Sequence, residues 1–515
     1  MVAENQAANL VGRIARNAVA NYIGQFVVMG IGFLITPFVV HRLGDSQYGI
    51  WGLTGSVVAY LTLLDLGFSA GAARFIARFE GEGRRQEISI LISTLWWVYC
   101  GLGAVALSGA AAVTLFLPHL FRIEPTLVQV ACVTLLLAGL HLALHLPTSL
   151  FNAILVGEQR IDLNNVASIV GRLIEAALTV ALVSLGWGAV ALAVASIVAT
   201  SVIAAVRRGI IQRMLPWLRM NWRSFDQHIL RQVLSFSAFV FGLQVTGLIA
   251  FNTDNIVLAT FLSAASITPF ALSYKLANLL TQVTQPLVNV LFPAFAEMQG
   301  RKDLERSRLL FIEGTQVSTV ISLLLGLILI FGADQILRMW VGEQYASSFR
   351  ILQLLAFSNL TIAAVGSSSS NLLLGYGRVR AFFLITVGHA VANLGLSVFL
   401  VAPLQGEGVA LGTVIPVSIA NLFFIFPLGC RTAGIPVWQG YHRILWPTLW
   451  PAFFAIAVYT GLKLMPGMAN QPLFCLAGMG LSYLLCYMLL SSGRYQSVAY
   501  LRRFRQAMNL KRGTN

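Results

Sequence analysis

The chain has 515 residues, of which 57% are hydrophobic and 10% are charged, and its formal net charge is +15. Soluble domains carry roughly 45–50% apolar and about 25% charged residues, so this composition excludes a water-soluble chain. The excess of positive charge needs no nucleic-acid partner, because lysine and arginine are also the residues that accumulate in the cytoplasmic loops of membrane proteins.

Fourteen apolar runs approach the roughly 20 residues that a helix needs to cross a bilayer. In chain order they are 17–40, 47–69, 88–117, 124–148, 163–185, 187–206, 230–252, 256–292, 309–331, 350–373, 380–402, 408–429, 446–465 and 472–491. The stretch from Asn252 to Pro293 also fits one long broken helix, or a loop and a helix. The junctions are too short to hold a folded domain outside the membrane.

Lysine and arginine alternate between the junctions. One set of six junctions, together with the two ends, holds 27 of the 34 lysines and arginines, whereas the intervening junctions hold five, Arg42, Arg122, Arg338, Arg350 and Lys463. The rule that positive loops stay inside predicts a multi-pass protein of the inner (cytoplasmic) membrane with both ends in the cytoplasm. The N-terminal residues lack the pattern of a cleaved signal peptide, and none is expected.

The order of signals in the first half recurs about 220 residues later. The paired landmarks are Gly157 and Gly375, Gly186 and Gly406, and Pro216 and Pro436. Each period holds six apolar runs, so two like-oriented lobes are predicted, with chance matching of glycine-rich loops as the alternative. The predicted divisions are 1–222 for the first lobe, 223–440 for the second, and 441–515 for two further helices and a basic tail.

Polar residues at helical spacing predict which spans face a cavity, because such residues are costly in hydrocarbon. The eighth run carries Lys275, Asn278, Gln282, Gln285 and Asn289, with steps of three and four. Polar contacts between packed helices are the alternative for the amides. Lys275, a charge in the middle of a span, favours water or an anion.

Three more spans carry polar faces. In the fifth, Ser168, Arg172 and Glu175 share one face, where a self-neutralising Arg–Glu pair and a ligand site are both open interpretations. The faces of the eleventh and first spans are Thr386, His389, Asn393 and Ser397, and Asn17, Asn21 and Gln25. The repeat places the fifth and eleventh runs in corresponding positions, so both are expected to look inward.

Two acidic residues are candidates for binding a coupling ion, either a cation or a proton. Asp65 lies near the charged end of the second run and Asp254 near the end of the seventh. The alternative for Asp65 is an ion pair with Arg74 or Arg78. For Asp254, capping of the next helix is the favoured interpretation.

No cofactor or metal site is expected. His141 and His145 are four residues apart, but a metal site needs further ligands. The five cysteines have no ligand spacing and fit the interior of spans.

Several short segments together resemble a known family. In the first half these are 21–25 (NYIGQ), 37–51 (PFVVHRLGDSQYGIW), 64–67 (LDLG) and 74–77 (RFIA), and in the second 254–258 (DNIVL), 274–277 (YKLA), 291–294 (LFPA) and 371–378 (NLLLGYGR). Their order resembles the polysaccharide-biosynthesis branch of the multidrug/oligosaccharidyl-lipid/polysaccharide (MOP) exporter superfamily. The resemblance implies an all-α, MATE-like fold with two six-helix lobes around a central cavity, and two extra C-terminal helices.

The resemblance also implies a function. A member of this branch moves an undecaprenyl-diphosphate-linked oligosaccharide, such as an O-antigen, exopolysaccharide or capsule repeat unit, across the cytoplasmic membrane by alternating access. A cationic cavity would receive the diphosphate and sugar, and the last two helices would accommodate the lipid tail. The candidate cavity residues are Lys275, Arg172, Glu175, Asn278, Gln282, Gln285, His389, Asn393, Asn21 and Gln25.

The expected partners are this lipid-linked glycan, membrane lipids and polymerase or ligase machinery, and a monomer is the default expectation. Two alternatives stay open. A cation-coupled multidrug antiporter of the same superfamily would favour acidic and aromatic cavity residues, whereas the candidates here lean basic. A membrane glycosyltransferase, polymerase or ligase needs catalytic acids or bases beside the membrane, and the outer junctions are short, so we expect no enzyme.

Overall fold

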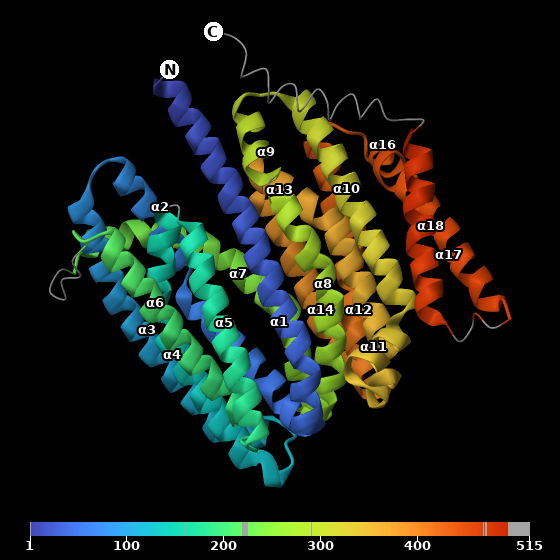
Figure 1. Cartoon of the computed structure of the whole chain (residues 1–515), viewed down its shortest axis with the longest axis horizontal. Helices are drawn as coiled ribbons and strands as arrows, with labels where there is room; N and C mark the ends of the chain where they lie inside the picture. Colours follow the sequence, from blue (N-terminus) through green and yellow to red (C-terminus); the bar gives the residue numbers. More distant parts are fainter. Residues whose placement is uncertain are drawn as a thin grey trace. The chain divides into compact units, whose positions relative to one another are not determined.

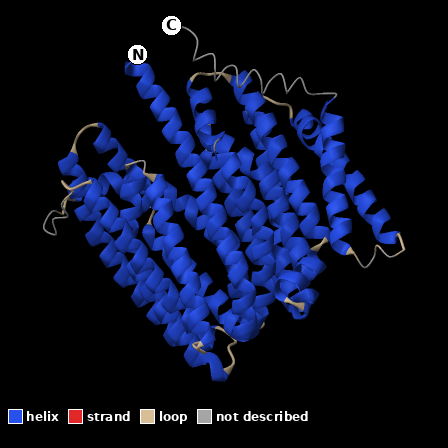
Figure 2. Ribbon diagram, in the orientation of Figure 1, coloured by secondary structure: helices blue, strands red, loops and turns tan. Residues whose placement is uncertain are grey.

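The computed structural model describes residues 2–158, 160–218, 225–289, 291–466, 468 and 471–492. Side chains are described from Gly24 onward, apart from scattered positions that lie mostly within 235–251. In these ranges the chain is built of helices joined by short turns, with no strand (Figure 2). The predicted all-α class is therefore confirmed.

The chain forms two compact units, and each is described by itself. Unit 1 comprises Met1–Leu272 and Ala390–Gly412, and unit 2 comprises Ser273–His389 and Thr413–Asn515. The predicted division at 222 and 440 stays a prediction.

Unit 1 is built mainly from seven helices of the first half (Figure 1). They are α1 (Val2–Leu61), α2 (Phe68–Gly81), α3 (Arg85–Leu120), α4 (Val128–Gly157), α5 (Ile161–Ser184), α6 (Val190–Met214) and α7 (Gln227–Phe261).

Unit 2 holds most of the remaining helices. They are α8 (Ile267–Asn289), α9 (Leu291–Gly300), α10 (Leu304–Phe331), α11 (Ala333–Val341), α12 (Phe349–Thr361), α13 (Ser367–Gly375), α14 (Val379–Ile419), α15 (Phe426–Thr432), α16 (Val437–Gly440), α17 (Trp446–Leu464) and α18 (Pro472–Ser492). The first residues of α8 and the middle of α14 belong to unit 1.

Ten segments in the described part of the chain are long and apolar enough to cross a membrane. Two of them, Gly24–Asp65 and Arg380–Thr432, each contain a backbone break, at Gly44 (φ 71°) and at Gln405 (φ 51°). Both breaks fall at junctions that the sequence predicts, between 40 and 47 and between 402 and 408. The chain is a multi-pass membrane protein, and the number of fourteen membrane spans stays a prediction.

The predicted junction at 253–255 is wrong, because α7 continues through it to Phe261. The polar residues that suggested a loop are accommodated inside the unit by α1. The Thr253 hydroxyl is hydrogen-bonded to the Tyr60 hydroxyl at 2.6 Å, and the Asn255 amide donates to Ser56 at 3.0 Å. Asp254 therefore lies within a helix, and the capping interpretation of this residue is wrong.

Small residues let α3 and α4 approach closely, as in many membrane helix pairs. A Cβ placed on Gly103 would lie 2.7 Å from the carbonyl oxygen of Ala143, and one placed on Gly139 would lie 2.4 Å from the Cβ of Ala110. Both glycines thus mark positions where a larger side chain has no room.

The junctions of unit 1 collect at two ends. At one end, Arg85 lies over the Trp217 ring at 5.2 Å, and the Asp226 backbone N–H donates to the Thr94 hydroxyl. This basic end, made of residues 82–84, 158, 160, 215–218 and 225–226, belongs to the arginine-rich junctions that the sequence predicts on one side.

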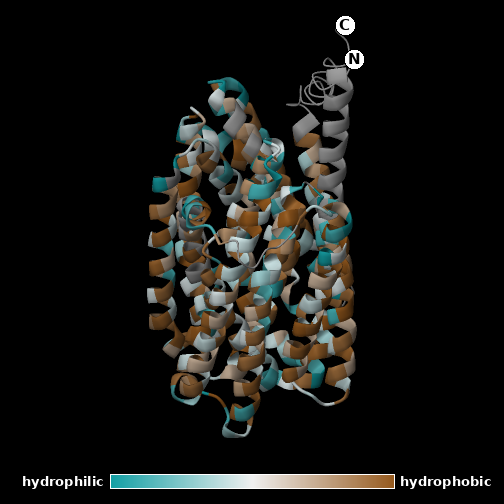
Figure 3. Cartoon of the chain, turned by 90° about the vertical axis from the view of Figure 1, so that its left-hand side faces the viewer, coloured by the Kyte–Doolittle hydropathy of each residue, from teal (hydrophilic) through white to brown (hydrophobic). Residues whose placement is uncertain are grey.

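The opposite end of unit 1 contains the junctions poor in lysine and arginine. There Gln47 accepts a hydrogen bond from the Ala189 backbone N–H at 3.0 Å, and the Arg122 N–H donates to the Ala259 carbonyl at 3.0 Å. Helix α3, of 36 residues, runs between the two ends. Hydrophobic residues predominate along the helices and hydrophilic ones gather at the turns (Figure 3).

Candidate functional site

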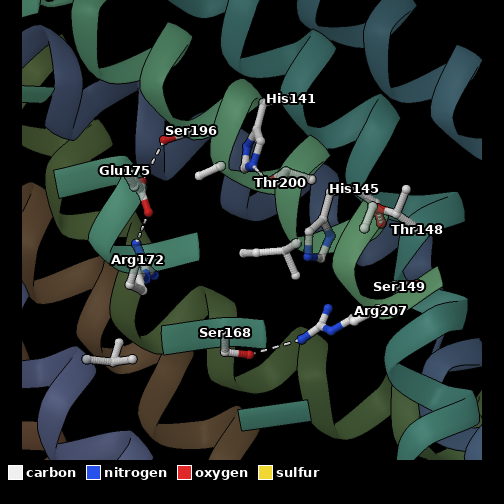
Figure 4. A pocket seen from close by; sticks show the side chains of 14 residues that line it. His141, His145, Thr148, Ser149, Ser168, Arg172, Glu175, Ser196, Thr200 and Arg207 are labelled. Carbon is white, nitrogen blue, oxygen red and sulfur yellow. Dashed lines mark hydrogen bonds and ion pairs between the residues drawn. The ribbon is translucent and has the colours of Figure 1, made fainter. Parts of the chain in front are cut away.

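A cavity of about 360 Å³ lies within unit 1, lined by α1, α4, α5 and α6. Its polar wall comprises His141, His145, Thr148, Ser149, Ser168, Arg172, Glu175, Ser196, Thr200 and Arg207 (Figure 4). Ionisable residues within membrane spans are rare and mark functional sites by default. Two guanidinium groups, one carboxylate and two imidazoles around one cavity therefore make it the candidate site.

Arg172 and Glu175 form an ion pair on the wall of this cavity. The Arg172 Nη1 lies 2.6 Å from the Glu175 Oε2, and the Glu175 Oε1 accepts a hydrogen bond from the Ser196 hydroxyl of α6 at 2.9 Å. The arginine side chain is 51% exposed and the glutamate 23%. The ion pair forms and also faces a cavity. The interpretation as a self-neutralising pair and the interpretation as a ligand site are therefore compatible.

Arg207 is a cavity residue that the sequence argument missed. In the sequence it stands beside Arg208 directly after the apolar run 187–206, in a charged junction, whereas the structure places it on α6 with its Nη2 donating to the Ser168 hydroxyl at 3.1 Å. Its Nε is buried and has no hydrogen-bond partner among the described residues. The spacing of Ser196, Thr200 and Arg207 along one face of α6 was the signal that would have found it.

The two histidines lie side by side on α4, with ring centroids 6.0 Å apart. The His141 Nε2 is hydrogen-bonded to the Thr200 hydroxyl at 2.8 Å. The described residues contain no group of three or more His, Cys, Asp or Glu side chains that would hold a metal ion.

Asp65 belongs to a hydrogen-bond network that reaches the cavity wall. Its Oδ1 accepts from the Tyr99 hydroxyl at 2.6 Å and from the Ser69 hydroxyl at 2.8 Å. The Ser69 hydroxyl lies 3.3 Å from that of Ser149, which lines the cavity. Of the two arginines expected to pair with Asp65, Arg78 pairs with Glu82 at 2.8 Å, and a pair with Arg74 stays a prediction.

The polar face of α8 lies in unit 2. The Asn278 side chain accepts from the Thr281 hydroxyl at 2.6 Å, and the Gln285 amide accepts from Ser367 at 3.2 Å. Lys275 and Gln282 are half-buried. Whether these residues bind a ligand stays a prediction.

The other predicted residues are distributed as follows. Asn393 is fully buried and His389 is half-buried, both on α14. Gln25 is exposed on α1, whereas the side chain of Asn21 lies outside the described residues. Of the ten candidate cavity residues, Arg172 and Glu175 line the cavity of unit 1, together with Ser168 of the same predicted face.

Burial and nearby arginines shift the pKa values of carboxylates at the basic end of unit 1. Burial raises the pKa of Glu158, and the neighbouring Glu80 carboxylate raises it further, against an opposing effect of Arg85. Hydrogen bonds from Arg78 and Arg84 lower the pKa of the exposed Glu82. These groups belong to the end of the unit and not to the cavity wall.

The fold is that of the MOP exporters. "Lipid II flippase MurJ, inward closed conformation" aligns with a TM-score of 0.71 at 14% identity, covering 94% of this chain and 100% of that chain. An inward-facing multidrug resistance MATE transporter of the MOP superfamily aligns with a TM-score of 0.62 at 17% identity, covering 81% of this chain and 96% of that one. The class of protein is thus a multi-pass membrane protein with the MOP fold.

Sequence comparison gives the family. Residues 43–350, more than half of the chain, match the family model described as "Polysaccharide biosynthesis protein", and the chain belongs to this family. The "Succinoglycan biosynthesis transport protein ExoT" of Rhizobium meliloti is 24% identical over 372 residues, which are 71% of this chain and 70% of that protein. The "Uncharacterized membrane protein EpsK" of Bacillus subtilis is 20% identical over 494 residues, 92% and 95% of the two chains.

Proposed function

We propose that this protein is a flippase that moves an undecaprenyl-diphosphate-linked oligosaccharide across the inner membrane. The observation that carries the proposal is the guanidinium of the half-buried Arg207 in a hydroxyl-lined cavity between membrane helices. Its Nε is buried and has no hydrogen-bond partner among the residues that the structure describes. A diphosphate cannot enter hydrocarbon without compensation for its charge. Arginine provides that compensation, because its fork of N–H groups matches phosphate oxygens.

The cavity has the dimensions of a small-ligand pocket, for which roughly 300–1,000 Å³ is typical. We therefore assign it to the diphosphate and the adjoining sugar rather than to a whole repeat unit. Arg207 and Arg172 would bind phosphate oxygens, and the hydroxyls of Ser168 and Thr148 would exchange hydrogen bonds with the sugar. The lipid tail would remain in the bilayer while the bound head crosses it by alternating access.

The family supports this proposal, as does the name of one relative, a succinoglycan biosynthesis transport protein. The distribution of lysine and arginine supports both ends in the cytoplasm. Under this proposal the partners are the lipid-linked glycan, membrane lipids and the polymerase or ligase that uses the flipped glycan, and the protein works as a monomer without catalytic residues.

The test is a flipping assay with purified protein in liposomes. An undecaprenyl-diphosphate-linked oligosaccharide with a fluorescent sugar is placed in both leaflets, and dithionite quenches the dye on the outer leaflet only. Arg207→Gln removes a charge-assisted hydrogen bond worth about 1.5–3 kcal/mol, so the affinity should fall by about 10- to 150-fold. Arg207→Lys should retain part of this affinity.

The matched control is Arg213→Gln, which removes an exposed arginine from the same helix and should flip at the wild-type rate. Equal rates for the Arg207 and Arg213 variants would contradict the assignment of the cavity. Efflux of a cationic dye without movement of the glycan lipid would indicate the antiporter instead. Transfer of the labelled sugar to a new product would indicate an enzyme.

A further inference from the structure

The polar groups of the unit 1 cavity are ordered along its length. At one end, the Arg207 end, this guanidinium on α6 donates to the Ser168 hydroxyl of α5 at 3.1 Å. Glu175 lies about two turns further along α5 than Ser168, which is about 10 Å along the helix axis. There, at the Glu175 end, the carboxylate accepts from the Ser196 hydroxyl of α6 at 2.9 Å. Figure 4 shows the two contacts at separate corners of the cavity.

The Glu175 end presents hydrogen-bond acceptors. An ionised carboxylate has no donor, and the single hydroxyl hydrogen of Ser196 is directed to Glu175. Arg172 donates to the other oxygen of Glu175 at 2.6 Å and stands one turn before it, toward the Arg207 end. His141 and Thr200, which also line the cavity, are hydrogen-bonded to each other at 2.8 Å. A ligand at the Glu175 end therefore meets oxygen lone pairs.

This order of groups matches the order of groups in a sugar diphosphate. The diphosphate is negative and accepts hydrogen bonds, so it fits the Arg207 end, where N–H groups match phosphate oxygens. The sugar follows the diphosphate, and its hydroxyls donate the hydrogen bonds that Glu175 and Ser196 accept. Ser168 and Thr148 then lie beside the edge of the sugar nearest to the diphosphate. One ligand thus fills both ends of the cavity in a single orientation.

The Glu175 end also disfavours one class of sugar. A carboxylate on the sugar would bring a second negative charge against Glu175 and would offer it no hydrogen. Like charges placed against each other reduce affinity, and a buried acceptor that loses its donor adds to that cost. Arg172 offsets only part of the repulsion, because its side chain is 51% exposed and water screens its charge.

We propose that the Glu175 end is the subsite that determines sugar specificity. It takes a neutral sugar with free hydroxyls next to the diphosphate, and it rejects an acidic sugar such as a uronic acid. This inference rests on the proposed function and narrows its substrate to glycans whose diphosphate-linked sugar is neutral. Glu175 and Ser196 are the residues that contact this sugar and select it.

The test compares UDP-glucose with UDP-glucuronic acid by calorimetry of the purified full-length protein. Both probes are diphosphate diesters with a sugar, as in a lipid-linked glycan, and the uridine takes the place of the lipid. They differ at one carbon, where the hydroxymethyl group of glucose is replaced by a carboxylate. The measured quantity is the ratio of the two dissociation constants, and the wild type should favour UDP-glucose by about ten-fold or more.

Glu175→Gln should bring this ratio close to one, because UDP-glucuronic acid gains more affinity than UDP-glucose when the opposing charge is removed. The amide also supplies an N–H that a sugar carboxylate accepts. Arg172→Gln should raise the ratio, since the charge of Glu175 is then no longer offset, and it carries the test if Glu175→Gln does not fold. The matched control is Asp162→Asn. It removes a carboxylate of the same helix that pairs with Arg160 at 3.1 Å outside the cavity lining, so its ratio should equal that of the wild type.

The outcomes separate this inference from the proposed function. Equal affinities of the wild type for the two probes, or tighter binding of UDP-glucuronic acid, would overturn the sugar subsite and leave the flippase proposal intact. A wild-type ratio in Glu175→Gln or in Arg172→Gln would also overturn the subsite. Failure of the wild type to bind either probe would overturn both proposals.

Discussion

Replacing Glu175 by glutamine should tighten anion binding rather than weaken it. The carboxylate neutralises Arg172 at 2.6 Å on the cavity wall. The glutamine amide has nearly the same shape, and its oxygen can still accept the hydrogen bond from Ser196 that the carboxylate accepts at 2.9 Å. The variant therefore removes one negative charge from the cavity with little change in packing.

The expected magnitude follows from the exposure of the pair. Two unit charges 4 Å apart interact by about 4 kcal/mol at an effective dielectric constant near 20, but partly exposed pairs contribute only about 0.2–1 kcal/mol. With Arg172 half-exposed, we expect its release to add about 0.5–1 kcal/mol to anion binding, which is a gain of about two- to five-fold in affinity. Arg172→Gln should have the opposite effect, because it leaves Glu175 as an unpaired negative charge.

The assay is the dissociation constant for UDP-glucose, measured with each variant at one pH and salt concentration. The exchange variant, Arg172→Glu with Glu175→Arg, serves as the control for geometry. Weaker binding in Glu175→Gln, accompanied by a lower unfolding temperature, would refute the reasoning and assign the pair a structural role. Wild-type affinity in the exchange variant would lead to the same conclusion, since the position of the guanidinium would then not matter.

Two further predictions concern stability, measured as the midpoint of thermal unfolding in detergent. Gly103→Ala should lower this midpoint, because the new Cβ would lie 2.7 Å from the Ala143 oxygen and overpacking typically costs about 1–3 kcal/mol. The control is Gly101→Ala, which has open space around its Cβ and should match the wild type. Glu158→Gln should flatten the pH dependence. Burial raises the pKa of Glu158 in the folded state above the ordinary 4.5, so its contribution to stability is present below that value and is lost as the pH rises through the raised pKa. A variant whose midpoint falls toward neutral pH as steeply as that of the wild type would contradict this account.

The sequence predicted the features that depend on local chemistry. The length of each apolar run is a local property of the sequence, and it predicted the membrane class. The placement of arginines between these runs is also local, and it predicted which junctions of unit 1 lie at the same end. The breaks at Gly44 and Gln405 fall where the apolar runs are interrupted. Arg172 and Glu175 could be paired from sequence because residues three apart are neighbours on a helix.

The junction at 253–255 shows where local chemistry misleads. Polar residues predicted a turn there, but α1 supplies hydrogen-bond partners to Thr253 and Asn255 from about 200 positions away in the chain. With those groups satisfied, the helix continues. No pattern within the segment itself contains that information.

The cavity is likewise a product of tertiary structure. Arg207 meets Ser168 across 39 positions, and His141 meets Thr200 across 59. Sequence alone determined that these polar groups lie on or beside membrane spans, because their cost in hydrocarbon is a property of each residue. Which of them face one another was decided only by the packing of α4, α5 and α6, since helices distant in sequence become neighbours only when the chain has folded.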